Sequence, residues 1–207
     1  MPTATMLTDE ELVARCKVEL PRETRSYEML VQRHMHRVYS TVYRVVGNKE
    51  EAEDIAQEVF IKVYHGLHKF EQQSSFSSWL YRIATNSALD ALDKIKRRPQ
   101  GAAPLHTPAA NEGEEETNPL NLQASGQVGP EEQALQAELQ ECIGEVMKKL
   151  ERDQARLILM RDFEDLSYDE IALSLKVKLS AVKMRIHRAR LAFQTLFMQL
   201  CGSRYLN

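Results

Sequence analysis

The amino-acid sequence predicts an all-α protein with two small helical domains joined by a flexible linker. Only 7% of the 207 residues are aromatic, and the strong helix formers Leu, Ala, Glu, Gln and Arg are common. Apolar residues recur at helical steps of three and four on both sides of a central stretch that lacks this period. That stretch, 99–130, holds five of the seven prolines and four of the eight glycines. The expected domains are therefore 8–98 and 131–201, with a flexible acidic linker at 99–130.

The composition sets limits on function. With 43% hydrophobic and 28% charged residues, the chain is typical of a soluble folded protein. No apolar run is long enough to span a bilayer, and the first residues do not resemble a secretory signal, so we expect a cytoplasmic protein. A net charge of −3 argues against a protein that coats nucleic acid through bulk charge. Any contact with nucleic acid has to come from a local basic patch.

The cysteines are three in number and widely separated, at Cys16, Cys142 and Cys201. They form no CxxC pair, which would be typical of a metal or redox site. We therefore predict three reduced thiols, as expected in a cytosolic protein.

The first domain begins with two helices. Thr8 and Glu11 form a capping box, and the helix that they open should stop near Pro21. A second helix is expected from about Tyr27 to a turn at Gly47 and Asn48.

The next helix, from Glu50 to about Leu67, has the clearest apolar period in the chain. Its opposite face begins with acidic and amide side chains. They favour either a solvated face near a helix N-terminus or a docking face for a basic partner. The buried stripe should consist of Ala52, Ile55, Ala56, Val59, Phe60, Val63, Tyr64 and Leu67.

A short polar loop, "EQQSS" at 71–75, precedes a further helix that begins near Phe76 and ends in the basic run "DKIKRR". Trp79 is the one tryptophan of the chain. It is either a core residue or a ligand contact, and burial is the more common role of this residue type.

The second domain contains a helix-turn-helix pattern. Ser167 and Glu170 form a capping box, Lys176 to Leu179 make a short turn, and Ser180 is the expected cap of the second helix. After Glu170 the chain has seven Lys and Arg residues and no Asp or Glu. A basic helix of this kind fits the major groove of DNA, where an acid would repel the phosphates. The alternative is a helical hairpin with a solvated basic face.

These segments resemble the extracytoplasmic-function sigma factors, which are small specificity subunits of bacterial RNA polymerase. "AEDIAQEVFIKVYHGLHKF" (52–70) and "FSSWLYRIATNSALD" (76–90) are similar to sigma region 2. "LSYDEIALSLKVKLSAVKMRIHRAR" (166–190) is similar to sigma region 4. Their order, with a tether and no folded domain between them, is the most specific part of the resemblance.

The resemblance implies a function and a set of binding residues. A member of this family binds core polymerase, recognises the −35 and −10 promoter elements, and melts the −10 region to start transcription of a stress- or signal-responsive regulon. Its region 2 binds the β′ clamp helices through residues that correspond to Asp54, Gln57 and Glu58. The corresponding −10 residues are Glu71, Gln72, Gln73, Ser74, Ser75, Phe76, Trp79, Tyr81, Arg82, Asn86, Lys94, Lys96, Arg97 and Arg98. The −35 residues are Ser180, Ala181, Lys183, Met184, Arg185 and Arg188.

The resemblance also implies partners. They are the polymerase core, through its β′ clamp helices and β flap, promoter DNA, and an anti-sigma factor, which would provide the only route to a membrane. The linker would thread the RNA-exit path, with its negative charge, from Glu112, Glu114, Glu115 and Glu116, mimicking nucleic acid. No cofactor or metal is implied. His65 and His68 have a spacing that could bind zinc but is more typical of surface histidines.

Several positions depart from the family pattern. Glycine is common where Asp165 and Lys176 stand, and "GTVKSR" is common where this chain has "SAVKMR". Lys176 either adopts a positive φ, at a cost of about 1–2 kcal/mol, or the turn avoids that conformation. Ala181 and Met184 lack the hydroxyls that could bond DNA, so the −35 preference is expected to differ from that of relatives.

Two other kinds of function remain open. One is a free-standing helix-turn-helix regulator that binds a palindromic operator as a dimer. The other is a sigma-like protein that acts only by sequestering a partner. Neither needs the −10 melting segment. No P-loop, HExxH or GxSxG motif is present, so we do not expect an enzyme.

Overall fold

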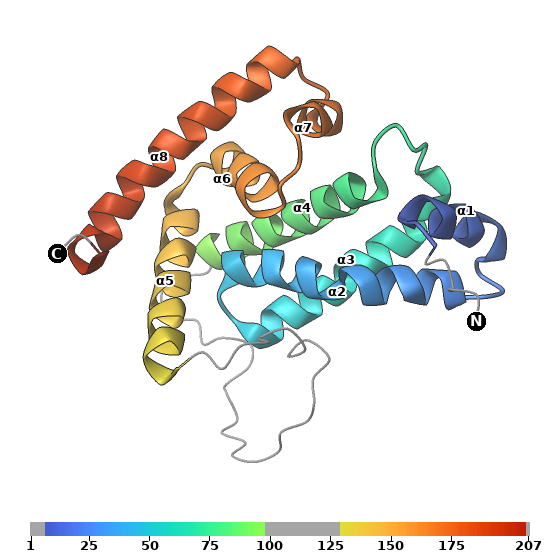
Figure 1. The fold of residues 1–207 in the computed structure, drawn as a ribbon, viewed down its shortest axis with the longest axis horizontal. Helices are drawn as coiled ribbons and strands as arrows, with labels where there is room; N and C mark the ends of the chain where they lie inside the picture. The colour runs from blue at the N-terminus through green and yellow to red at the C-terminus, as the bar shows by residue number, and fades with distance from the viewer. Residues whose placement is uncertain (1–6, 98–128, 206–207) are drawn as a thin grey trace.

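The computed structural model describes residues 7–97 and 129–205, and within these ranges it consists of helices and turns without a strand. The predicted all-α class is therefore confirmed. The greater part of the expected linker, with Arg98 and the four glutamates at 112–116, lies outside the described residues. Figure 1 shows helices α1 to α4 on one side of this segment in the chain and α5 to α8 on the other.

The first group is a helical bundle around an apolar core. It comprises α1 (Asp9–Glu19), α2 (Arg25–Val46), α3 (Lys49–Gly66), the 3-10 turn η1 (Leu67–Lys69) and α4 (Phe76–Arg97). Helices α2, α3 and α4 pack against one another. Of the stripe expected on α3, all members are buried except Tyr64, which is half-buried.

The helix boundaries follow local capping chemistry. The Thr8 side chain accepts a hydrogen bond from the backbone N–H of Glu11 (3.2 Å), and the Glu11 carboxylate accepts one from the Thr8 N–H (2.7 Å). Helix α1 ends before Pro21, and α2 ends at Gly47, which has a φ of 76°. This left-handed conformation is natural for glycine. The predicted capping box and the predicted turn are both confirmed.

The second group carries the helix-turn-helix. It comprises α5 (Pro130–Lys149), α6 (Arg152–Ile158), the π-helix η3 (Leu159–Phe163), α7 (Tyr168–Leu175) and α8 (Leu179–Tyr205). The capping box of Ser167 and Glu170 is confirmed at the start of α7. The prediction that Ser180 caps the second helix is wrong, because α8 begins one residue earlier and Ser180 lies in its first turn.

The turn between α7 and α8 places Lys176 in the left-handed region, with φ 55° and ψ 43°. Of the two conformations left open by the sequence, the turn therefore adopts the one that favours glycine. Its N–H still closes the end of α7 by bonding to Leu173 O at 3.3 Å. Lys176 thus keeps the usual geometry of the motif, at the cost of a steric clash between its Cβ and the backbone that glycine would not have.

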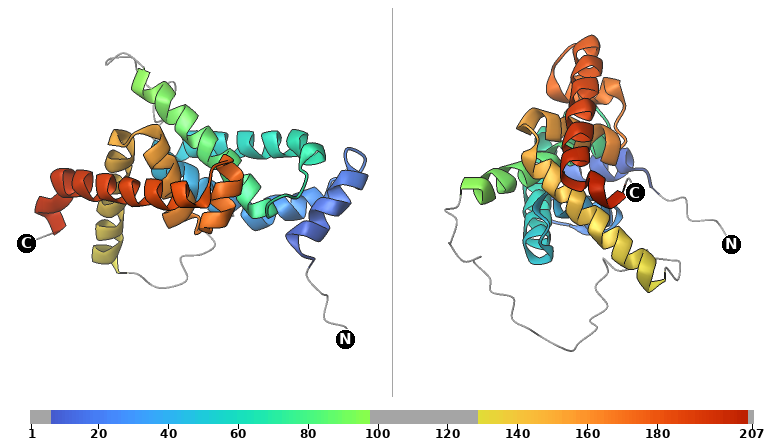
Figure 2. Two further views of the ribbon diagram at one scale, coloured as in Figure 1. Left: turned by 90° about the horizontal axis from the view of Figure 1, so that it is seen from above. Right: turned by 90° about the vertical axis from the view of Figure 1, so that its left-hand side faces the viewer.

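The two groups pack against each other, which the sequence did not predict. Helix α4 contacts α6, η3 and α7, and α2 contacts α5. In the left view of Figure 2, α8 crosses α5, and its C-terminal end projects beyond it. Arg152 of α6 forms an ion pair with Asp90 of α4 at 2.5 Å and also bonds to Asp93.

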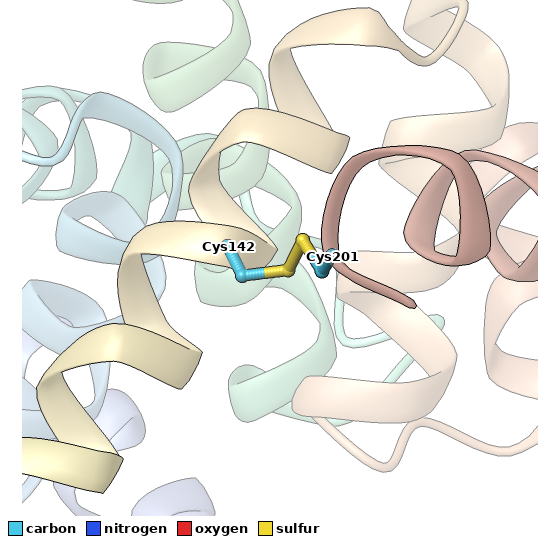
Figure 3. Close-up of a disulfide and its surroundings, with 2 residues drawn as sticks. All are labelled: Cys142 and Cys201. Carbon is cyan, nitrogen blue, oxygen red and sulfur yellow. A yellow bond between two sulfur atoms is a disulfide. The ribbon is translucent and has the colours of Figure 1, made fainter. Parts of the chain in front are cut away.

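The prediction of three reduced thiols is wrong for two of them. Cys142 of α5 and Cys201 of α8 form a disulfide across a sequence separation of 59, with their Cα atoms 6.3 Å apart (Figure 3). The packing of α8 on α5 creates this pair, so no local spacing signals it. Cys16 is a buried free thiol, and burial raises its pKa to about 11.

The strained turn gives a test of the fold. We expect Lys176→Gly to stabilise the protein by about 0.5–1 kcal/mol, because glycine relieves the positive-φ strain but gains freedom in the unfolded chain. Urea unfolding followed by circular dichroism measures this change. Lys178→Gly is the matched control, since Lys178 is not among the residues with positive φ, and it should destabilise. Equal effects of the two substitutions would contradict the assigned turn.

Candidate nucleic-acid and partner interface

The acidic face of α3 is open to solvent. Asp54, Gln57 and Glu58 are all exposed on the side of the helix that faces away from the core. One turn further along the same face stands Ile61, a large apolar side chain that is 58% exposed. Sequence reasoning missed Ile61. Its position, four residues after Gln57 and three after Glu58, places it on the same face of the helix and was a usable signal. The face therefore presents apolar area beside acidic and amide groups, a combination that a protein partner can use.

A groove of about 450 Å³ runs between this face and α4. Asp54 and Glu58 line it on one side, and Asp90, Lys94 and Arg97 line it on the other. Lys94, Lys96 and Arg97 are exposed, so the basic end of α4 is available to phosphates.

The loop at 71–75 lies between η1 and α4, as expected. Glu71, Gln72 and Gln73 are exposed, and Gln72 has a φ of 56°. Ser75 turns inwards, and its hydroxyl lies 2.7 Å from that of Ser78. The loop therefore offers a polar rim with backbone held in an unusual conformation, which is a common property of binding sites.

Trp79 is half-buried beneath this loop. Its ring stacks on Phe70 with centroids 4.9 Å apart, and a Cβ on Gly66 would lie 3.1 Å from it. Gly66 thus allows the indole to lie close to the end of α3. Trp79 is partly core, but one edge lines a pocket of about 270 Å³ that also includes Gln73 and Arg82.

The structure corrects two of the expected −10 residues. Phe76 and Tyr81 are only 1% and 2% exposed, because both side chains point into the core of the bundle. The Tyr81 hydroxyl lies 3.0 Å from Nδ1 of His34, whose Nε2 is 2.7 Å from Asp9. Burial raises the pKa of Tyr81 to about 12. These side chains support the surface and cannot contact DNA in this arrangement.

The expected −35 residues share one face of α8. Its inner side is fixed by Val182, Ile186 and Ala189, which are buried. Ala181 is half-buried, whereas the other five expected residues are exposed: Ser180, Lys183, Met184, Arg185 and Arg188. Arg190 follows Lys183 by seven residues along α8 and therefore lies near the same edge of this face, but its side chain pairs with Asp162 at 2.5 Å and so contributes to structure.

One buried carboxylate joins the two groups of helices. Glu164, directly after η3, is 2% exposed. Its Oε2 accepts a hydrogen bond from Nε of Arg37 at 2.7 Å, its Oε1 accepts one from the Thr41 hydroxyl, and its backbone carbonyl accepts another from Arg37. Arg37 also lies over the ring of Tyr81, 4.7 Å from its centroid.

A second contact reaches the 71–75 loop itself. Oε1 of Glu170 accepts hydrogen bonds from the hydroxyls of Ser78 (2.5 Å) and Ser75 (3.0 Å). Arg82 donates to the carbonyl of Ser174 at 3.2 Å. Leu173, Ser174 and Lys176 also line the pocket beside Trp79. Helix α7 therefore covers part of the surface predicted to bind the −10 element.

Hydrogen bonds stabilise the ionised form of the Glu170 carboxylate. Partial burial would raise its pKa, but hydrogen bonds from Ser78, Ser167 and Ser75 outweigh burial and lower the pKa to about 2. The ionised carboxylate thus accepts a hydrogen bond from the Ser167 N–H at the start of α7 and, at the same time, one from the Ser75 hydroxyl of the loop.

Within residues 7–97 and 129–205, no helix combines the length and apolar character needed to cross a membrane. The same residues include no group of three or more His, Cys, Asp or Glu side chains placed to hold a metal ion.

Comparison with known proteins gives two family matches. The model of sigma-70 region 2 matches residues 30–98, and the model of sigma-70 region 4 matches residues 140–193. The RNA polymerase sigma-H factor of Pseudomonas aeruginosa is 32% identical over 187 residues, which cover 90% of this chain and 92% of that protein. The ECF RNA polymerase sigma-E factor of Escherichia coli K12 is 35% identical over 188 residues, which cover 89% and 91%.

Solved structures show the same fold. The complex of CnrH with the cytosolic domain of CnrY matches 91% of this chain and 96% of that chain, with a TM-score of 0.59 and 20% identity. RpoE of Bartonella quintana in complex with the anti-sigma factor NepR matches 82% and 95%, with a TM-score of 0.52 and 19% identity.

The Glu170 contact predicts a pH-dependent stability. A carboxyl whose pKa is lowered by folding stabilises the protein fully above its ordinary value of 4.5, and this contribution is lost as the pH falls towards about 2. We expect Glu170→Gln to lower the thermal unfolding midpoint at pH 7. Below pH 3, the midpoints of the variant and of the native chain should lie closer together.

Asp169→Asn is the matched control, since Asp169 is its exposed neighbour. Thermal unfolding between pH 2 and pH 7 measures both variants. A midpoint difference for Glu170→Gln that does not change with pH would contradict the assigned hydrogen bonds.

Proposed function

The chain belongs to the extracytoplasmic-function group of the sigma-70 family, and we propose that, as a promoter-specificity subunit of bacterial RNA polymerase, it recognises the −35 and −10 elements and melts the −10 region. It is not an enzyme, since the polymerase carries out phosphoryl transfer. The observation that carries the proposal is the presence of both DNA-facing surfaces in one chain: the 71–75 loop with Trp79, and the exposed basic face of α8.

The core-binding surface is the exposed face of α3. Asp54, Gln57 and Glu58 supply charge and hydrogen-bond acceptors to a basic partner such as the β′ clamp helices, and Ile61 supplies apolar area at the centre of the contact. Charged residues around such a contact guide association and orientation more than they raise affinity.

Melting of the −10 element is assigned to the loop at 71–75 and its surroundings. A base flipped from the duplex costs a few kcal/mol of stacking, which a shaped pocket has to offset. The pocket beside the loop is lined by the Trp79 indole, which offers an aromatic contact to a base, and by Arg82, which can bind the nucleic-acid backbone. Asn86 is half-buried beyond it, and Lys94, Lys96 and Arg97 are exposed for upstream phosphates. The same role is proposed for Arg98.

Recognition of the −35 element is assigned to the N-terminal half of α8. Lys183, Arg185 and Arg188 point outwards together, so the helix can enter the major groove with its basic side. Met184 is exposed in the same row and favours contact with an apolar thymine methyl rather than a hydrogen bond.

The proposed −10 surface is partly covered in the packed arrangement, whereas the α8 face is exposed. Helix α7 bonds to Ser75 and Ser78 through Glu170, and its Leu173 and Ser174 line the pocket beside Trp79. Reading of the −10 element therefore requires region 4 to move away from region 2. We propose that binding to the core, in the cytoplasm, separates the two regions, and that an anti-sigma factor favours the packed form.

The runner-up, a dimeric operator-binding regulator, has no need for a region 2 of this kind. Run-off transcription with purified core polymerase on fragmented genomic DNA separates the two functions. We expect new discrete transcripts that depend on this protein and that share upstream elements. Absence of any complex with the core would overturn the proposal in favour of the dimeric regulator.

The α3 face gives a prediction for core binding. We expect Asp54→Arg combined with Glu58→Arg to abolish the complex with core polymerase, because two acids facing a basic partner become two bases. Co-elution with the core measures binding, and circular dichroism confirms that the fold is retained. Glu10→Arg with Glu23→Arg is the control of equal charge change, at exposed positions outside the α3 face. Normal binding by the α3 variant would refute the assignment.

The α8 face gives a prediction for DNA. Arg185→Ala should weaken binding to the −35 element by roughly 1–3 kcal/mol if it makes a bidentate contact with a base. Competition between −35 sequences in a binding assay measures the effect on selectivity. Arg190→Ala, by contrast, removes the ion pair with Asp162 and should lower stability without altering selectivity. Unchanged promoter preference in Arg185→Ala would show that Arg185 contacts only phosphate or solvent.

A further inference from the structure

The disulfide ties the far end of α8 to α5. Cys142 and Cys201 are 2% and 3% exposed, and they lie in a small apolar cluster with Val146, against which Phe193 and Leu196 pack. Figure 3 shows the bond running directly from one helix to the other. Phe193 and Leu196 also pack against the main core, so this small cluster adds the attachment at the far end of α8, around Cys201.

The reducing cytoplasm, in which the proposed function takes place, argues against a permanent Cys142–Cys201 disulfide. The inference rests on the proposed function, since a subunit of RNA polymerase works in the cytoplasm. That compartment keeps thiols reduced, and the disulfides found there are usually transient, catalytic or redox-sensing. A pair that is placed within bonding reach by helix packing, in such a protein, is expected to change state with the redox conditions.

Access to the bond is available at the end of α8. Cys201 lies close to the last residue of the helix, Tyr205, and is followed by Gly202. Helix ends fray, and glycine is a poor helix former, so the last turn can open to admit a small oxidant or a reductant. Its neighbours Met198 and Leu200 are already exposed.

The bond affects the DNA-reading element because α8 is continuous. The helix runs from Leu179 to Tyr205, so its N-terminal half presents the proposed −35 residues while its C-terminal half carries Cys201. A cross-link over 59 residues restricts the unfolded chain and holds α8 on α5. Oxidation should therefore stabilise region 4 as a unit, whereas reduction leaves only apolar contacts to hold this end.

We propose that Cys142 and Cys201 are a reversible oxidative modification site, at which a peroxide joins α8 to α5 and a dithiol separates them. One thiol loses its proton, its thiolate attacks hydrogen peroxide and the O–O bond breaks; a sulfenic acid forms, and the departing hydroxide takes up the proton and leaves as the first water. The second thiol attacks that sulfur, the S–O bond breaks, and the second water leaves. The two thiols lose two electrons, which reduce the peroxide. A dithiol reverses the reaction by exchange and becomes a disulfide itself.

The first experiment maps the thiols of the full chain. After treatment with hydrogen peroxide, we expect one alkylatable thiol, Cys16, in unfolded protein and a peptide that links Cys142 to Cys201. After treatment with dithiothreitol we expect three alkylatable thiols. Failure of the pair to form, a cross-link through Cys16, or a bond that resists dithiothreitol in the folded protein would each overturn the proposal.

The second experiment compares the oxidised and reduced forms. We expect reduction to lower the unfolding midpoint of region 4 by about 10 °C and to shorten the survival of run-off transcription activity at raised temperature several-fold. Cys142→Ser should abolish both differences, and Cys16→Ala should keep them. Equal midpoints for the two forms would overturn the proposal. Lack of transcription in either form, with the midpoint difference intact, would count against the proposed function and leave the thiol site supported.

Discussion

The arrangement of the two regions depends on one buried carboxylate. Glu164 lies almost fully out of water, and a charge in such a place is costly unless it is paired and fully hydrogen-bonded. Arg37 and Thr41, both on α2, satisfy its side-chain oxygens. Removal of Arg37 would leave the buried acid without its charge partner, and removal of Thr41 would leave Oε1 without its hydrogen bond, so the contact strongly favours a single relative position of region 4. Glu170 and Arg152 add hydrogen bonds and ion pairs on both sides of this point, but each is more exposed.

This packing connects stability with the control of DNA binding. The side chains that hold region 4 in place, Ser75 and Ser78 under Glu170 and Arg82 under Ser174, belong to or adjoin the proposed −10 surface. Under the proposed function, contacts that stabilise the free protein are therefore contacts that promoter DNA has to replace. The α3 face, in contrast, lies open in the same arrangement. A polymerase can thus bind region 2 before the two regions separate.

Local patterns predicted the features that depend on nearby residues. The capping boxes at Thr8 and Ser167 and the turn at Gly47 follow from sequence, since each is completed within a few positions. Long-range contacts were beyond such patterns. Nothing near Cys142 in the chain signals Cys201, and Glu164 resembles a surface acid until α2 is placed beside it. Tyr81 was misjudged for the same reason, because an aromatic residue in a DNA-binding motif can face either side of its helix.

The number of residues in the π-helix η3, between α6 and α7, sets the directions of two carboxylates. Its wide turn, closed by the N–H of Glu164 bonding to Leu159 O at 2.9 Å, directs Asp162 to Arg190 of α8 and Glu164 to α2. Each residue of an α-helix turns the chain by about 100°. Loss of one residue here would therefore rotate both carboxylates away from their partners, even if every side chain were kept. Such a segment is expected to tolerate substitution during evolution far better than insertion or deletion, because its residue count couples the recognition helix to the rest of the molecule.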